Sequence, residues 1–474
     1  MPQSDLSNKS LKWYQGLDRY CWVVLIIAAL GWLFDTMDQN LYNLIRVPSL
    51  KDILSKTISD PVVLEASVKA KGGLITAIFL LGWSVGGFIF GVLADRIGRA
   101  KTMIVTILIY ALCTGLNGLA QTWEQYALAR FFTALGVGGE WAAGASLVAE
   151  VFPQRSRAMA LGFLQALSAV GNMMAATITL GLGNLDTHWR WAYFVGAAPA
   201  LLIFWILKSV KEPQKWQDAK AKATVGKELG NMGELFSNRK LRRNTIAAVL
   251  LGTAGVGGLW GVGFFSTDML RSELVKSGWS PTAMGRAVSS MFFLQQAGAF
   301  IGIYLFAAFS EKITRRAAFT LWFALAWASI LAFFWGLQGA GTDAYLRALA
   351  LAPILGFCTL GPFSGYTLYF PELFPTRLRT TGCGFGYNAA RILAAAAPFV
   401  LGSLAAKFAL FGADGHLIRG GYAQAATCVS FVYLLGFIGV LIGPETKGKP
   451  LPEDKDFEVG SRHFEPAMAE AGTQ

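Results

Sequence analysis

The sequence predicts an all-α membrane protein with twelve transmembrane helices in two pseudo-symmetric six-helix bundles. Three observations predict this fold: an apolar composition, apolar runs of membrane-spanning length, and a sequence motif that occurs once in each half. Hydrophobic residues make up 54% of the 474 residues and charged residues only 15%. A soluble protein of this size carries about 25% charged residues, so the composition favours a chain that lies largely in lipid.

The apolar runs have the length that a membrane-spanning helix needs. Such a helix takes roughly 20 apolar residues to cross about 30 Å of hydrocarbon, and only helices or closed barrels can span that layer. Barrel strands would be about 10 residues of alternating polarity, whereas runs such as Leu74–Ala94 and Ile104–Ala120 are longer and do not alternate. We therefore expect helical spans, centred near Gly31, Trp83, Tyr110, Leu135, Ala169, Ala200, Gly257, Ala297, Leu325, Phe357, Ala394 and Leu434.

The basic residues predict how these spans are oriented. The net charge is +12, and residues 208–243, between the sixth and seventh spans, contain ten Lys/Arg against four acids. Basic residues accumulate on the cytoplasmic side of membrane proteins, which explains the charge without nucleic acid as a partner. We expect a multi-pass protein of the cell (inner) membrane with both termini cytoplasmic. Its parts would be a six-helix bundle (1–208), a basic linker (209–243), a second bundle (244–443) and a cytoplasmic tail (444–474).

Cysteine and histidine give no sign of a cofactor. The five cysteines are scattered, and the three histidines lie in predicted loops or the tail, so we expect neither a disulfide framework nor a metal site. The sequence also shows no nucleophile–base pair or phosphate loop, which argues against an enzyme. We expect no cofactor, with a proton gradient as the driving force, no catalytic residue, and a monomer surrounded by lipid.

Repeated phrases predict the two bundles. Residues 149–158 read AEVFPQRSRA and residues 371–380 read PELFPTRLRT, so both fit Glu-x-Phe-Pro-x-Arg-x-Arg. A weaker match relates ADRIGRA (94–100) to SEKITRR (310–316). The similar motifs KEP and PETKG stand at the ends of the first and second halves. Ordered matches at nearly equal offsets indicate homologous halves, an arrangement found in transporters with a central site at the membrane midplane.

These motifs resemble a known family. GVLADRIGRAK (91–101) resembles the loop signature of the major facilitator superfamily between spans 2 and 3, and RFFTALGVGG (130–139) resembles its fourth-span motif. AEVFPQRSR, PELFPTRLR and PETKG resemble the branch shared by sugar porters and metabolite:H⁺ symporters, and GGEWAAGASLVAE looks like its lactate/sialate-type members. The resemblance covers nearly the whole chain and implies transport by alternating access.

The resemblance also implies a conformational latch. In the family, charges in these loops bridge the two halves on the inner side while the outer side is open. Gly91 and Gly98 allow a tight turn there; the second copy lacks both glycines and has Glu311 in place of Asp95, so we do not expect an equivalent latch from it. The alternative is that the charges only anchor the topology. The latch residues are Asp95, Arg96, Arg99, Glu150, Arg157, Glu372, Arg379 and Glu445.

Charged residues inside the spans are the candidates for proton coupling, because an ionisable group at such depth is costly and implies a function. Asp35 and Asp38 share one helical face in the first span, and Arg130 and Glu140 lie in the fourth. At about 1.5 Å per residue, Asp35 and Arg130 reach nearly the same height, so a contact of Arg130 with Asp35 or Asp38 is possible. Two neighbouring carboxylates repel, which favours a proton on one of them. Alternatively, the four charges only neutralise each other.

Arg391, near the midplane of the eleventh span, is the candidate for binding substrate. A guanidinium facing a cavity suits a carboxylate, and Asp-x-x-Asp combined with Arg130 and Arg391 is similar to aromatic-acid and other carboxylate:H⁺ symporters. The seventh span lacks the paired amides usual in sugar porters, which also favours an anion. Other side chains could line the cavity, or instead bond and pack between helices: Gln165, Asn172, Gln295, Gln296, Asn388 and Trp260.

The sequence therefore predicts proton-coupled symport of a small organic anion by alternating access. One alternative is a sugar or polyol:H⁺ symporter, which competition by hexoses would reveal. An alternative of another class is a non-transporting membrane sensor. Such a sensor usually carries a long extra cytoplasmic domain, and the short tail after Gly448 argues against it.

Overall fold

The computed structural model describes residues 12–182, 185–222, 229–394, 396–408, 410–411, 417–419 and 421–457. Some residues of the expected parts, namely 1–11 of the first bundle, 223–228 of the linker and 458–474 of the tail, lie outside the described residues.

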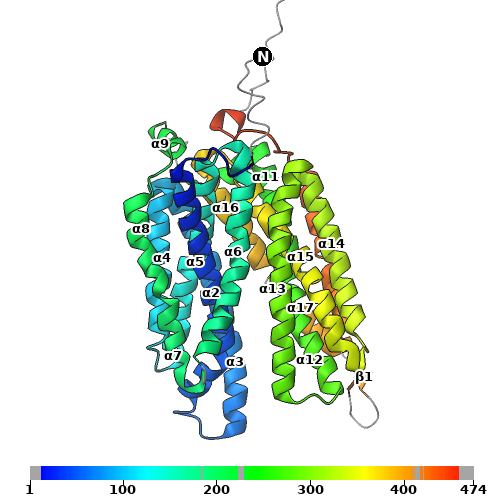
Figure 1. Cartoon of the computed structure of the whole chain (residues 1–474). Coiled ribbons are helices and arrows are strands. Elements are labelled where there is room, and N and C mark those ends of the chain that lie inside the picture. The colour runs from blue at the N-terminus through cyan, green and yellow to red at the C-terminus, as the bar shows by residue number, and fades with distance from the viewer. Residues whose placement is uncertain are drawn as a thin grey trace, which may run out of the picture.

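Long helices make up most of the described chain (Figure 1). The first half contains α2 (Arg19–Leu54), α3 (Pro61–Ile97), α4 (Arg99–Asn117), α5 (Trp123–Val151), α6 (Gln154–Gly181), α7 (Leu185–Gly196) and α8 (Leu202–Ser209), with the 3₁₀ turn η1 (Ala198–Leu201). The linker contains α9 (Gln214–Ala221) and α10 (Glu234–Ser237).

The second half contains α11 (Arg239–Gly261), α12 (Ser266–Lys276), α13 (Pro281–Lys312), α14 (Arg315–Leu337), α15 (Ala344–Tyr369), α16 (Arg379–Ala394), α17 (Ala396–Phe408), α18 (Tyr422–Ser430) and α19 (Tyr433–Ile442). Its 3₁₀ turns are η2 (Gly263–Phe265), η3 (Gly341–Asp343) and η4 (Thr376–Leu378), and η5 (Asp454–Phe457) follows in the tail. A two-stranded antiparallel hairpin, β1 (Leu410–Phe411) with β2 (Leu417–Arg419), is the small exception to the helical fold within the described ranges.

The same glycine-mediated helix contact occurs in each half. In the first half α3 packs on α5, and a side chain at Gly82 or Gly86 would overlap the α5 backbone. In the second half α13 packs on α15, and a side chain at Gly298 or Gly302 would overlap the α15 backbone. Small residues four apart allow helix backbones to approach closely. These Gly-x-x-x-Gly pairs are a further internal repeat that the sequence reasoning overlooked.

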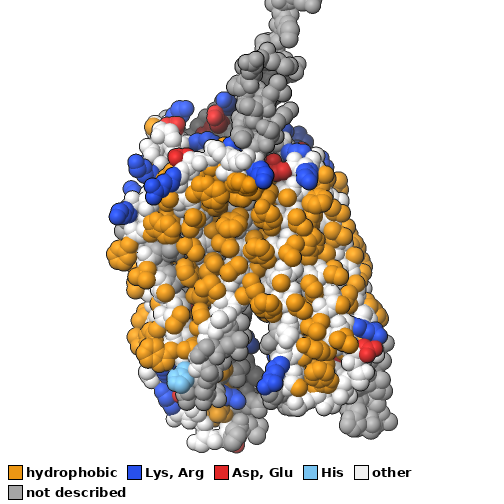
Figure 2. All heavy atoms as spheres, viewed as in Figure 1, with side chains coloured by type: hydrophobic (Ala, Val, Ile, Leu, Met, Phe, Trp, Pro, Cys, Tyr) orange, Lys and Arg blue, Asp and Glu red, His pale blue; other side chains and the backbone are white. Residues whose placement is uncertain are grey.

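The two halves meet most closely toward the linker end. Contacts between them run from α6 to α13 and from α3 to α16. Figure 2 shows the halves joined in the upper part of the view and separated by an opening toward the lower end. It also shows an apolar band around the middle and Lys/Arg side chains gathered at the upper end, which we call the basic end. A cavity between the halves would therefore open at the opposite end.

Nine helices of the described residues are long and apolar enough to cross a membrane, against twelve expected. The expected spans near Leu135, Ala200 and Ala394 are not among the nine. The first of them is α5, whose hydropathy is lowered by buried charges; the second is divided into α7, η1 and α8, and the third corresponds to α16 and α17. The molecule is nevertheless an all-α membrane protein, because the helices are present where the sequence places the spans.

Candidate functional site

Asp38 and Arg130 form a fully buried ion pair inside the first half. Arg130 Nη1 on α5 lies 2.9 Å from Asp38 Oδ2 on α2, and both side chains are 0% exposed. The Thr114 hydroxyl on α4 donates to Asp38 Oδ1 at 2.9 Å. The guanidinium also lies over the rings of Tyr42 and Phe79, at 4.6 and 4.3 Å from their centroids. Of the two contacts that the sequence allowed for Arg130, the structure contains the one with Asp38.

Asp35 lies next to a different carboxylate, that of Glu140. The two residues are 1% exposed, and the described residues supply no hydrogen-bond donor to any of their four carboxylate oxygens. Glu140 packs against the α2 backbone one turn before Asp35, where a side chain at Gly31 would overlap it. Buried unpaired carboxylates are costly to ionise, and the charge of Glu140 acts on Asp35 more strongly than that of Asp38 does. The arrangement therefore suits a shared proton.

Arg391 lies where the two halves meet, in a cage of aromatic and amide groups. Its guanidinium is 3.9 Å from the centroid of the Trp83 ring on α3 and 4.6 Å from that of Tyr387 on α16. Nη1 donates to Asn388 Oδ1 at 2.6 Å, whereas Nε has no hydrogen-bond partner among the residues that the structure describes. The side chain is 5% exposed, and no carboxylate in the described part of the chain pairs with it. A buried cation without a counter-ion favours an anion.

A row of polar and aromatic side chains continues from Arg391 across the first half. Tyr387 stacks on Trp141 of α5 with ring centroids 4.4 Å apart. The Trp141 indole N–H donates to Gln165 Oε1 on α6 at 3.2 Å. Gln165 therefore belongs to the same cluster as Arg391, through two rings that sequence reasoning did not select. Stacking or cation–π contact is not visible in a sequence, because the rings come from different helices.

The other amides are divided between two places. Asn172 on α6 donates to Gln296 on α13 at 3.1 Å, which bridges the halves, and Asn40 donates to Asn172 at 2.6 Å. Gln295 instead accepts from the hydroxyl of Ser266 at 3.3 Å, inside the second half. Gln296 and Asn172 are thus at the interface, whereas Gln295 is not.

Trp260 on α11 is partly buried and packs against the hydrophobic core. Its role as a residue that lines the cavity stays a prediction.

Four of the latch residues form one buried network across the halves at the basic end. Arg99 on α4 pairs with Asp95 at 3.0 Å and with Glu150 at 3.1 Å, both within the first half. Glu150 also pairs with Arg379 of the second half at 2.6 Å. Asp95 accepts the backbone N–H of Thr380 at 3.2 Å, and both the N–H and the hydroxyl of Thr381, at 2.8 and 2.7 Å. A carboxylate at a helix N-terminus is stabilising, so Asp95 caps α16 across the interface.

The other four latch residues contact their own half or the chain next to it. Arg96 donates to the linker carbonyl of Leu229 at 3.2 Å, and Arg157 donates to that of Ala149 at 3.0 Å. Glu372 pairs with Arg315 of the second half at 3.2 Å, and Glu445 accepts the backbone N–H groups that begin α14. Within the described residues none of these contacts crosses between the halves.

Two latch glycines differ in role. Gly98 precedes α4 with φ of 121°, a conformation that favours glycine, as the tight turn required. Gly91 lies inside α3, where it makes room for the backbone of Thr380, so the expectation of a turn there was wrong.

Sequence reasoning missed two residues of the charged clusters at the basic end. Arg315 is the repeat counterpart of Arg99, and Glu212 accepts the Arg99 and Lys101 N–H groups at 2.7 and 3.1 Å as Glu445 does those of α14. The aligned phrases ADRIGRA/SEKITRR and KEP/PETKG contained the signal for both.

The comparison with known families decides the identity of this fold. Residues 28–398 match the Major Facilitator Superfamily. The chain belongs to this superfamily.

Curated proteins named as transporters are similar to this chain over most of its length. The probable 4-methylmuconolactone transporter of Cupriavidus pinatubonensis is 29% identical over 421 residues, which are 88% of this chain and 89% of the relative. The cis,cis-muconate transport protein of Acinetobacter baylyi is 29% identical over 351 residues, covering 71% and 78%. Among solved structures, the proton:xylose symporter XylE matches with a TM-score of 0.69 at 17% identity, covering 93% of this chain and 99% of that one. That likeness shows the fold alone.

Proposed function

We propose that this transporter carries a small organic anion inward together with protons by alternating access. It would lie in a bacterial inner membrane with the basic end and both termini in the cytoplasm. The observation that carries the proposal is Arg391, a buried cation at the interface of the halves, with no carboxylate partner among the described residues. Arg130, in contrast, is already paired with Asp38. The named relatives transport muconate and a muconolactone, which supports an organic acid as the substrate.

The carboxyl groups would couple protons to this binding. Asp35 and Glu140 lie together, with no hydrogen-bond donor to them in the described ranges, and would take up a proton from the open end. Protonation of Asp38 would remove its charge from the pair with Arg130, so that the guanidinium could interact elsewhere. A bound anionic substrate and a bound proton together would neutralise the buried charges. The free-energy cost of burying charge would then be lower when the two halves close around the site.

Uptake of labelled carboxylates into proteoliposomes with an imposed pH gradient tests the coupling. We expect uptake to follow the gradient in the unmodified protein, and gradient-driven accumulation to be lost in the double variant Asp35→Asn/Asp38→Asn. Asp52→Asn is the matched control, because Asp52 forms a partly exposed pair with Arg190 at 3.2 Å, away from Asp35 and Asp38 in the sequence. Uptake that is independent of the pH gradient, or gradient-driven uptake that is retained in the double variant, would contradict proton coupling.

Substrate binding tests Arg391 separately. We expect Arg391→Gln to weaken carboxylate binding by at least about tenfold, because a hydrogen bond to a charged group is worth about 1.5–3 kcal/mol and about 1.4 kcal/mol is tenfold. Arg347→Gln, an arginine whose side chain is 51% exposed, is the control. Isothermal titration with muconate and with hexoses measures both; preferential binding of hexoses would favour the sugar alternative.

A further inference from the structure

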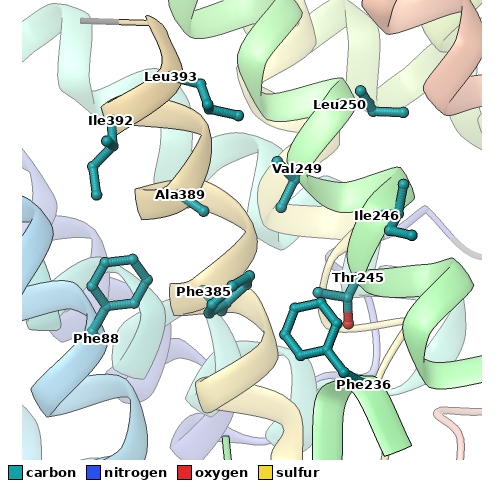
Figure 3. Close-up of a pocket in the computed structure, with 10 residues that line it drawn as sticks. All are labelled: Phe88, Phe236, Thr245, Ile246, Val249, Leu250, Phe385, Ala389, Ile392 and Leu393. Carbon is teal, nitrogen blue, oxygen red and sulfur yellow. The ribbon is translucent and has the colours of Figure 1, made fainter. Parts of the chain in front are cut away.

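An apolar groove lies between the halves near the basic end, outside the site described above (Figure 3). Its volume is about 400 Å³. Side chains of α3, α10, α11 and α16 line it: Phe88, Phe236, Thr245, Ile246, Val249, Leu250, Phe385, Ala389, Ile392 and Leu393. Thr245 supplies the single hydroxyl of this lining, and this hydroxyl donates a hydrogen bond to the backbone carbonyl of Leu241 at 2.9 Å. The groove thus offers a ligand hydrocarbon contacts only.

Both halves and the linker supply its walls. Phe385 on α16 lies between Phe88 on α3 and Phe236 on α10, with ring centroids 5.6 and 5.4 Å away. Phe88 belongs to the first half and Phe385 to the second. The groove exists in this form because α3 and α16 are in contact at this end.

The groove opens sideways, toward the hydrocarbon that surrounds the helices. Ile246 is 42% exposed, Ile392 52% and Leu393 59%. Ile246 lies on α11, which is long and apolar enough to span a membrane, and Ile392 and Leu393 lie on α16, which packs against α11. The natural neighbours of these exposed side chains are therefore acyl chains. A flat helix surface would contact many exchanging lipids, whereas a concave groove holds one chain along several side chains at once.

A basic side chain stands on the same face of α11, beyond the groove on the side of the basic end. Arg242 is three, four and seven residues before Thr245, Ile246 and Val249, so it shares their helical face. Arg242 is exposed, and no ion pair joins it to a carboxylate in the described part of the chain. Its exposed neighbours Arg239 and Arg243 add positive charge at the edges of that face. Along α11, from the basic end toward the groove, this face therefore changes from cationic to apolar. A phospholipid in the surrounding leaflet has the same order, from headgroup to acyl chain.

We propose that this groove binds an anionic phospholipid of the leaflet at the basic end. One acyl chain fills the groove beside Phe385 and Ala389, and the headgroup phosphate contacts Arg242. A net negative headgroup is expected because the exposed charged residues Arg239, Arg242 and Arg243 at this end of α11 are all basic, and they would repel the choline of a zwitterionic lipid. Since α3 and α16 both line the groove, the bound lipid also favours the state in which the basic ends of the halves are in contact.

Native mass spectrometry of the purified full chain, titrated with phosphatidylglycerol or phosphatidylcholine, tests the proposal. We expect tighter binding of phosphatidylglycerol to one site, and a loss of about fivefold in Arg242→Gln, the factor that one basic side chain contributes near an anionic membrane surface. Lys208→Gln is the matched control, because Lys208 is an exposed basic residue at the end of α8, outside the groove. It should leave the affinity unchanged.

Filling the groove tests the acyl-chain contact independently of charge. Ala389→Trp should reduce the single-site binding of phosphatidylglycerol at least as much as Arg242→Gln does; Ala389→Leu, a smaller change, serves if the first variant is not monodisperse. Equal affinity for the two lipids, unchanged binding in Arg242→Gln, or unchanged binding in a folded groove-filled variant would each overturn the proposal. Carboxylate uptake is not needed for any of these measurements, so their outcome is independent of the proposed substrate.

Discussion

Arg99 in the first half and Arg315 in the second half occupy equivalent positions with equivalent neighbours. Arg99 pairs with Asp95 four residues earlier and with Glu150, and Arg315 pairs with Glu311 four residues earlier and with Glu372. Each guanidinium also donates to the carbonyl oxygen five residues before it, at 3.1 and 2.7 Å. Internal geometry is therefore almost the same in both clusters.

The two clusters differ in what they contact across the interface. Asp95 is buried and caps α16 of the second half, whereas the Glu311 side chain is 32% exposed and pairs within its own half. Glu150 binds Arg379 across the interface, whereas Glu372 accepts from the Thr446 hydroxyl at 2.6 Å. No ion pair between Glu372 and Arg157 is found in the described residues. A shared repeat thus yields one cluster that joins the halves and one that stabilises its own half.

The largest expected effect comes from removing the cap. Asp95→Asn should raise the fraction of molecules open at the basic end by at least about tenfold, because charge-assisted hydrogen bonds are worth about 1.5–3 kcal/mol. Alkylation of Cys383 reports opening, since this native thiol on α16 is 0% exposed; peptide-resolved mass spectrometry separates it from the other cysteines. Glu311→Gln, the matched change in the second half, should leave the alkylation rate unchanged. An equal rise in both variants would break the comparison.

Double-mutant cycles should sharpen the comparison with a smaller effect. For Glu150→Gln and Arg379→Gln we expect a coupling energy of about 0.5–3 kcal/mol, the range for residues in direct contact. For the mirror pair, Glu372→Gln and Arg157→Gln, we expect a smaller coupling, because these two charges attract each other without forming an ion pair in the described residues. The Cys383 alkylation rate measures both cycles. Equal coupling in the two cycles would mean that the second cluster also joins the halves.

The smallest expected effects are opposite pH dependences of two carboxylates in the second half. Burial raises the pKa of Glu372, and Arg315 offsets this only in part. Burial would also raise the pKa of Glu445, but the backbone N–H groups of Lys447, Arg316 and Arg315 lower it below its ordinary value. The contribution of Glu445 to stability is therefore present above the ordinary glutamate pKa of about 4.3 and is lost as the pH falls through the lowered pKa. That of Glu372 is present below the ordinary value and is lost as the pH rises through the raised pKa.

Thermal unfolding in detergent across this pH range measures the difference. The midpoint of the unmodified protein minus that of Glu445→Gln should grow as the pH rises. The same difference for Glu372→Gln should shrink as the pH rises. Parallel trends in the two variants would contradict these opposite signs.

The sequence by itself determined the fold class and the place of the charged residues. Apolar runs must be helices in lipid because their backbone groups have no other partners there, and the repeated phrases located both clusters at the basic end. The resemblance to the superfamily was confirmed over residues 28–398. The roles of Asp35, Asp38, Arg130 and Arg391 in transport stay predictions.

Only the tertiary structure decided which charges meet. Spacing within α2 placed Asp35 and Asp38 on one face, yet the packing of α4 and α5 directs Asp38 to Arg130 and Asp35 to Glu140. The same phrase produces a cross-half pair from Glu150 but an internal one from Glu372. The physical reason is that local patterns fix helix faces, whereas a partner across the interface depends on the separation of the two bundles in the state that the protein adopts.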